Sequence, residues 1–98
     1  MKATELLRNR ITYSDTEFVE VVVWRLSRPA PGSEHLYKYR LAYVVNGECI
    51  LRYDTEAEKG DHRHRRGREY GYSFQSLESL LSDFRSEIRS LNDENRNT

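Results

Sequence analysis

The chain has 98 residues, of which 37% are hydrophobic and 33% are charged, and its 16 basic residues are balanced by 16 acidic ones. A chain of this length buries one modest core and is too short for several domains. The formal net charge of zero excludes a polycation, so any affinity for nucleic acid must come from locally clustered charges.

The cysteine content and the hydropathy of the chain indicate in which cellular compartment we expect the protein. Cys49 is the single cysteine, which excludes an internal disulfide and a four-cysteine zinc site and favours a reducing compartment. Residues 1–10 lack the apolar core of a secretory signal, and no run approaches the ~20 apolar residues that span a bilayer. We therefore expect a cytoplasmic protein without membrane contact, forming a single domain over residues 1–98 with a disordered polar tail at 92–98.

The first third of the chain predicts two strands. Residues 3–13 give a weak strand pattern, and a short helix over residues 3–9 is the alternative. Turn formers at 14–16 predict a hairpin into residues 18–26, the segment richest in β-branched and aromatic residues. Apolar residues on both faces of 18–26 indicate a central strand that is covered, at least in part, on both sides. Prolines in residues 27–33 then impose a loop.

Residues 37–54 predict a β-hairpin. Asn46-Gly47 is the preferred pair for a two-residue type I′ turn, because both positions need a positive φ. An uninterrupted ladder from this turn sets Tyr43 opposite Ile50 and Ala42 opposite Leu51. One face, expected to be core, then carries Tyr39, Leu41, Tyr43, Ile50 and Arg52. The other carries Lys38, Arg40, Ala42, Cys49, Leu51 and Tyr53, and we expect Cys49 to be a small buried hydrophobe.

The C-terminal part predicts a helix over residues 77–91. Ser76 suits the N-cap, and apolar residues recur from there at three- and four-residue steps. Residues 54–69 are expected to be a polar connection, with a possible short strand at 69–74. The expected class is α+β: an antiparallel sheet of four to five strands with one C-terminal amphipathic helix packed on a face.

Residues 59–68, with the sequence KGDHRHRRGR, hold two of the three histidines and five of the basic residues. A segment this basic is expected to be a surface loop or a strand end. If it is extended, His62 and His64 project from one face, about 6–7 Å apart at ~3.3 Å per residue, while Asp61 and Arg63 project from the other.

Two neighbouring imidazoles suit a general acid and a general base in RNA cleavage. The 2′-hydroxyl is then the nucleophile, so we expect neither a metal ion nor another cofactor. The catalytic candidates are His62, His64, Asp61 as the residue that orients one imidazole, and Arg63 as the residue that stabilises the transition state, a role that Arg40 also suits. The candidates for binding nucleic acid, through phosphate contacts, are Lys38, Arg40, Lys59, Arg65, Arg66 and Arg68. We expect one patch on one side of the molecule, formed by Lys38, Arg40, Lys59, Arg63, Arg65 and Arg66.

Two other interpretations of the segment stay open. It is a solvated basic loop with incidental histidines, or it is a metal site formed by Asp61, His62 and His64, with His35 as a further ligand. The neighbouring arginines disfavour the metal site because they repel a cation.

At these residues the sequence resembles a known family, the small bacterial and archaeal toxins of the TumE type. The resemblance runs from residue 2 to residue 91. It rests on VVVWRL (21–26), PGSEHLYKYRLAYVVNGECILRYD (31–54), KGDHRH (59–64) and Y-x-F-x-S-L-E-S-L-L-x-D-F (72–84). The resemblance implies a small cytoplasmic toxin that is neutralised by a cognate antitoxin encoded beside it, an antitoxin of the helix-turn-helix type.

Together, the residues and the resemblance predict the toxin component of a toxin–antitoxin system that acts on RNA as a metal-independent endoribonuclease. The alternative is a non-catalytic toxin that binds nucleic acid and blocks translation or replication. A third option is an interaction protein in which residues 63–68 receive an acidic partner segment. A homodimer through an exposed edge strand is compatible with each of these.

Overall fold

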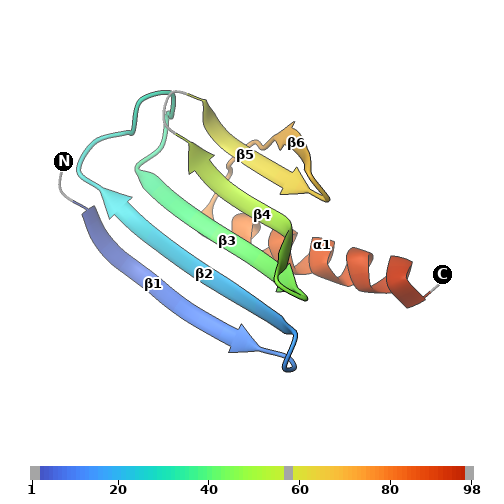
Figure 1. Cartoon of the computed structure of the whole chain (residues 1–98). Helices are drawn as coiled ribbons and strands as arrows, with labels where there is room; N and C mark the ends of the chain where they lie inside the picture. Colours follow the sequence, from blue (N-terminus) through green and yellow to red (C-terminus); the bar gives the residue numbers. More distant parts are fainter. Residues whose placement is uncertain (1–2, 57–58, 97–98) are drawn as a thin grey trace.

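The computed structural model describes residues 3–56 and 59–96 and consists of one antiparallel sheet with one helix against it (Figure 1). The α+β class and the single C-terminal helix are confirmed, but the sheet has six strands rather than four to five, in the order β1-β2-β3-β4-β5-β6. The elements are β1 (Ala3–Thr12), β2 (Glu17–Leu26), β3 (Tyr37–Val45), β4 (Glu48–Glu56), β5 (Gly60–Arg65), β6 (Arg68–Gly71) and α1 (Leu77–Arg96).

The first hairpin, β1 and β2, forms as predicted, and the helical alternative for residues 3–9 is wrong. The turn of this hairpin is closed by the backbone N–H groups of Tyr13 and Ser14, which both donate to the carbonyl of Glu17. On one face of β2, Val19, Val21 and Val23 are buried in the core. No second layer covers the other face within the described residues, where cationic side chains lie over the aromatic rings of this strand instead.

The second hairpin turns where the sequence predicts, with φ of 52° at Asn46 and 77° at Gly47. The predicted register is nevertheless wrong beyond the first pairs, because a β-bulge shifts the ladder so that Tyr43 faces Leu51 rather than Ile50. A one-residue shift moves every later side chain to the opposite face. The core therefore contains Leu51 and Tyr53 but not Arg52, whereas Ile50 is partly buried and packs against this core. Cys49, expected to be buried, is exposed.

The basic segment forms a third hairpin rather than the polar connection expected over residues 54–69. Strand β5 pairs with β4, and β6 pairs with β5 across a turn at Arg66-Gly67, where φ is 49° and 81°. These angles match the Asn46-Gly47 turn, but arginine seldom adopts a positive φ, so composition alone did not identify this turn.

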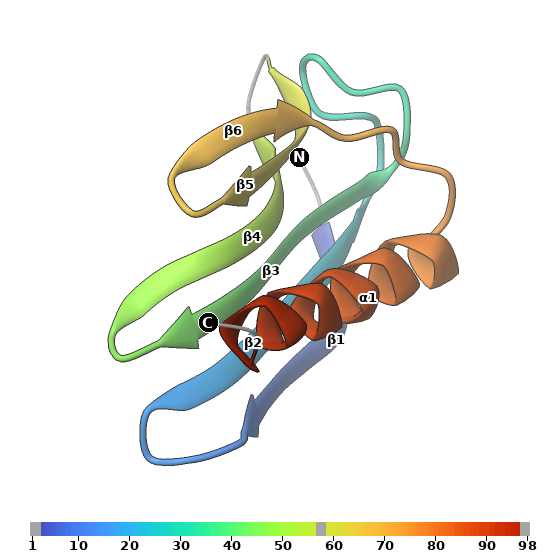
Figure 2. The ribbon, with the colours of Figure 1, turned by 90° about the vertical axis from the view of Figure 1, so that its right-hand side faces the viewer.

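Helix α1 begins where predicted, with the N–H of Ser79 donating to the hydroxyl of Ser76 at 3.0 Å. It packs across one face of the sheet (Figure 2), burying Leu80, Phe84, Ile88 and Leu91. The helix was expected to end near Leu91 but continues to Arg96. Its last turns are held to the sheet by a hydrogen bond from the Tyr43 hydroxyl to Asn92 Oδ1 and by an ion pair between Arg65 and Glu94. The remainder of the expected tail, residues 97–98, lies outside the described residues.

Candidate functional site

Strand alternation divides the basic segment between the two faces of the sheet. Asp61 and Arg63 project toward the face that α1 covers, where they contact Tyr39 and Glu87 respectively. His62 and His64 project to the opposite face, across from Asp54 and Arg52 of β4. We call this uncovered side the open face. The expected alternation of the segment is confirmed, and it separates the four catalytic candidates into two groups.

On the helix side, Asp61 orients a histidine that the sequence interpretation left in a minor role. Its carboxylate lies 2.8 Å and 3.0 Å from Nε2 of His35, and it accepts a 2.6 Å hydrogen bond from the Tyr39 hydroxyl. Phe74 stacks on the His35 ring with 4.0 Å between centroids. Burial, and then the bond to Asp61, raise the pKa of Tyr39, which keeps the phenol a donor. Asp61 thus serves His35 rather than His62 or His64.

Arg63 and Arg65 also belong to the helix side. Their guanidinium groups donate to the two carboxylate oxygens of Glu87 at 3.1 Å and 2.9 Å. The hydroxyl of Tyr53 donates to the same carboxylate. The expectation that these arginines form one patch with Lys38 and Arg40 is therefore wrong. Arg63 and Arg65 lie on the helix side and neutralise buried Glu87, whereas Lys38 and Arg40 lie on the opposite face of the sheet.

The open face groups His64 with two carboxylates of β4. His64 Nε2 lies 3.0 Å from Glu56 Oε1 and 3.9 Å from Asp54 Oδ1. The hydrogen bond with His64 is the main reason that the pKa of Glu56 lies below its usual value. Burial raises the pKa of Asp54, and the adjacent Arg52 offsets this only in part. Environments that push two carboxyl pKa values apart are typical of acid–base sites.

His62 is more enclosed than His64. Its Nε2 lies 3.0 Å from the carbonyl oxygen of Lys59. Its Nδ1 lies 3.0 Å from Glu69 Oε1, in an ion-pair contact whose angle is too poor for a hydrogen bond. Since both ring nitrogens face acceptors of the protein, a substrate would have to displace one of them.

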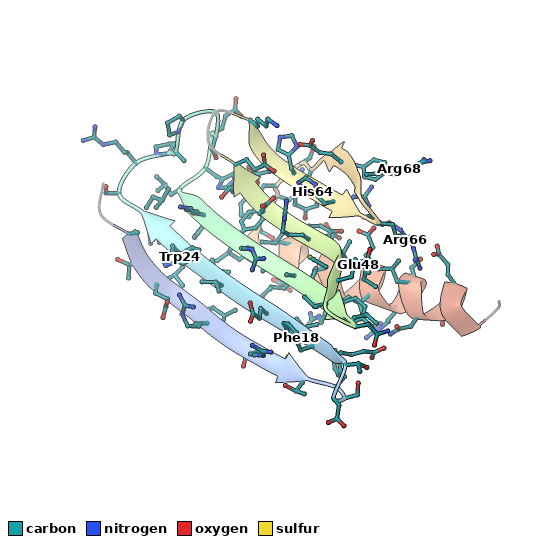
Figure 3. All side chains as sticks on the ribbon, in the orientation of Figure 1. Phe18, Trp24, Glu48, His64, Arg66 and Arg68 are labelled. Atoms are coloured by element: carbon teal, nitrogen blue, oxygen red, sulfur yellow. The ribbon has the colours of Figure 1, made fainter. Side chains whose placement is uncertain are left out.

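Aromatic rings and cations fill the rest of the open face. The guanidinium of Arg10 lies 3.9 Å from the ring centroid of Phe18, and Lys38 Nζ lies 5.8 Å from that of Trp24. Arg40 lies on the same face, 3.7 Å from Glu20. Figure 3 shows Phe18, Trp24 and His64 on the side of the sheet turned toward the viewer, away from α1.

The remaining binding candidates lie at the ends of β5 and β6. Lys59 is exposed just before β5 and lies 3.8 Å from Glu56. Arg66 and Arg68 are exposed at the hairpin end (Figure 3), where Arg66 also contacts Glu94 of the helix at 3.6 Å.

Sequence interpretation missed several residues of the open face. They are Arg8, Arg10, Phe18, Trp24, Arg52, Asp54 and Glu56. A signal for the last three was present in their i, i+2 spacing along one strand, which places them on one face. Pairing with β5 was needed to bring that face beside His62 and His64, and the expected loop did not provide it.

The metal ligands considered from the sequence do not come together, since Asp61 and His35 lie on the helix side while His62 and His64 lie on the open face. The described residues instead place ligand atoms of Asp54, Glu56 and His64 within 4.8 Å of one another. Three protein ligands are the number in a catalytic zinc site. However, Arg52 lies 3.1 Å from Asp54 and Lys59 lies 3.8 Å from Glu56, so the carboxylates have cationic partners without a metal.

The fold and this surface define a small two-layer α+β protein with one sheet face packed on a helix and the other lined by aromatic, basic and imidazole groups. The chain belongs to the Toxin TumE family, whose model matches residues 2–92. It is therefore the toxin component of a toxin–antitoxin system, and the family implies a cognate antitoxin partner. No curated protein and no solved structure matches the chain. Within the described part of the chain, no helix has the length and apolar character needed to cross a membrane.

Proposed function

We propose that this toxin acts on RNA in the cytoplasm as an endoribonuclease and that its substrate lies on the open face. The observation that carries the proposal is the common face shared by Trp24, Phe18, Arg40 and the two histidines. Single-stranded RNA is bound in proteins by aromatic rings that stack on bases and by cations that track the phosphates.

His64 is the better placed of the two imidazoles to act as the general base. Glu56 holds its Nε2, which leaves Nδ1 for a proton from the substrate, and a quarter of the side chain is exposed. In the proposed reaction His64 takes the proton of the 2′-hydroxyl, and that oxygen attacks the phosphorus. The bond from phosphorus to the 5′-oxygen breaks as this oxygen is protonated. The products are a 2′,3′-cyclic phosphate and a 5′-hydroxyl.

His62 is the proposed general acid, freed when a phosphate displaces the half-exposed Glu69 from its Nδ1. Arg40 and Arg52 share this face and stabilise the charge on phosphorus. They take the part first assigned to Arg63, while Asp61 contributes indirectly by fixing β5 through His35 and Tyr39. No step of this reaction requires a metal ion.

The alternative is a non-catalytic toxin that binds nucleic acid and blocks translation or replication. The observation in its favour is that both histidines already contact acceptors of the protein. Under this alternative, the aromatic and basic residues of the open face carry the whole effect.

The experiment incubates the purified chain with total cellular RNA in the presence and absence of EDTA. We expect cleavage in both cases, and His64→Ala should slow it by about 10²–10⁴-fold, the usual cost of losing a general base. Ser86→Ala, at an exposed position of the helix that packs on the opposite face, is the control and should cleave at the wild-type rate.

Three results would change the proposal. RNA bound but left intact by the wild-type protein favours the non-catalytic alternative. Cleavage that disappears with EDTA and returns with Mn²⁺ or Zn²⁺ assigns Asp54, Glu56 and His64 to a metal instead. A folded His64→Ala variant that cleaves normally contradicts the acid–base assignment.

A further inference from the structure

Strand β1 is an edge strand that is exposed along its whole length. Its ten residues are all exposed, and in the described structure it pairs only with β2. Five large hydrophobic side chains are exposed in the described residues, and four of them, Leu6, Leu7, Ile11 and Tyr13, lie in β1 or directly after it. A long edge strand with apolar side chains invites pairing with another chain, and proteins usually protect such an edge.

A groove runs between this strand and the helix. Its volume is about 190 Å³. The residues that line it come from β1, β2 and α1 and are mostly apolar: Leu7, Asn9, Ile11, Tyr13, Val19, Val21, Leu81, Phe84, Arg85 and Ile88. The register of β1 is irregular between Glu5 and Leu7, so residues 7–12 form its uninterrupted part, and this part borders the groove.

The two flanks of α1 differ in how their charges are matched. On the flank toward β5 and β6, Glu87 and Glu94 pair with arginines and Asp83 accepts a hydrogen bond from Tyr72. On the flank toward β1, Arg85 and Arg89 form no ion pair within the residues that the structure describes. Glu17 is the one carboxylate that lines the hollow beside these two arginines. The groove therefore has an apolar floor, and the charged residues that line it and the adjoining hollow are two arginines and one glutamate.

These features decide between the two possible occupants of the groove. A second copy related by a two-fold axis would place the same surface on itself, with Arg85 and Arg89 close to their equivalents. A partner with carboxylates beside apolar side chains matches both the apolar floor and the two arginines. We propose that the cognate antitoxin docks here, adding an extended segment to β1 along residues 7–12 and placing apolar side chains in the groove and acidic ones opposite Arg85 and Arg89.

This proposal rests on the family membership, which implies an antitoxin, and not on the proposed RNA chemistry. The groove lies on the helix side of the sheet, whereas His64 lies on the open face. Antitoxin binding can therefore be measured without RNA, and failure of either proposal leaves the other standing.

The test titrates the purified toxin with its purified cognate antitoxin by calorimetry. Ile11→Glu, which puts a charge over the groove, should weaken binding by about tenfold or more. Arg89→Glu, on the exposed helix surface, should weaken it several-fold and reduce its salt dependence. The matched controls are Tyr70→Glu on the opposite edge strand and Arg28→Glu in the loop after β2, and both should bind within twofold of the wild type.

Hydrogen exchange adds a readout for strand addition, since the amides of residues 7–12 should exchange more slowly in the complex. Folded Ile11→Glu and Arg89→Glu variants that bind like the wild type would overturn the proposal. So would a Tyr70→Glu variant that loses binding. A toxin dimer that forms without antitoxin and dissociates on Ile11→Glu would assign the groove to a second copy and also overturn it.

Discussion

Glu87 shows at the scale of one residue how this small sheet and its helix are joined. It is the one buried charged residue among those described. Its carboxylate accepts hydrogen bonds from the side chains of Tyr53, Arg63 and Arg65. Burial alone would raise the pKa of Glu87, but the hydrogen bonds from Tyr53 and Arg65 and the charge of Arg63 outweigh it, so that the pKa lies below its usual value. A buried carboxylate with this many donors is costly to leave half-paired.

We predict that Glu87→Ala lowers the free energy of unfolding by about 3 kcal/mol, because it leaves the Arg63 guanidinium and the Tyr53 hydroxyl without their acceptor, whereas Arg65 keeps Glu94. Since the folded pKa is depressed, the stabilisation is present above the unfolded value of about 4.3 and is lost as pH falls below it. Urea unfolding from pH 7 to pH 3 should therefore show a loss of stability that Glu87→Gln reduces. Glu48→Gln, exposed at the start of β4, is the control and should keep the wild-type dependence.

Two glycines with a positive φ differ in what surrounds them. Gly60 (φ 79°) begins β5, and a Cβ there would lie 2.9 Å from the carbonyl oxygen of Gly32, whereas a Cβ on Gly67 (φ 81°) would meet nothing within 4 Å. We predict that Gly67→Ala costs about 1 kcal/mol from backbone strain and that Gly60→Ala costs more, because a backbone contact must also move. Thermal unfolding of both variants checks this, and equal losses would contradict it.

At the scale of the elements, sequence patterns predicted structure wherever a single local signal was sufficient. The strands 18–26 and 37–54, the Asn46-Gly47 turn and the start of the helix at Ser76 were all found in this way. The bulge beside Val44 was not predicted. Both faces of this hairpin carry apolar residues, so an extra residue in one strand does not visibly change the apolar pattern. The Arg66-Gly67 turn was missed because its first residue is not one that usually takes a positive φ.

Phe84 is the largest side chain that the helix contributes to the core. Phe84 is 2% exposed and packs edge-on against Tyr53 with 5.7 Å between centroids. We predict that Phe84→Ala costs about 3–5 kcal/mol, from lost burial and from the cavity that remains. Ser86→Ala on the exposed side of the helix should change the free energy of unfolding by less than about 0.5 kcal/mol. A cost for Phe84→Ala below about 1 kcal/mol would mean that α1 is not held to the sheet as described.

At the scale of the whole molecule, the sheet places charged residues that are adjacent in the sequence on two opposite faces. Residues 59–68 look like one basic patch along the chain, yet alternation sends Arg63 and Arg65 to the helix and His62 and His64 to the open face. The candidate site could be predicted only in part for this reason. Strand alternation predicted which residues of β5 share a face. That Asp54 and Glu56 lie beside them could be known only from the pairing of β4 with β5.

This separation predicts that two arginine variants fail in different ways. Arg40 lies on the open face with half of its side chain exposed, so Arg40→Ala should weaken RNA binding and keep the free energy of unfolding within about 0.5 kcal/mol. If Arg40 neutralises one phosphate, the slope of log affinity against log salt should fall in magnitude by about 0.7. Arg63→Ala removes one partner of buried Glu87, so it should lower stability while the folded fraction binds RNA with unchanged affinity and salt dependence. Fluorescence anisotropy over a salt series, together with urea unfolding, measures both effects. The opposite pattern, with Arg63→Ala reducing the salt slope and Arg40→Ala leaving it intact, would place the RNA on the helix side and contradict the assignment of the open face.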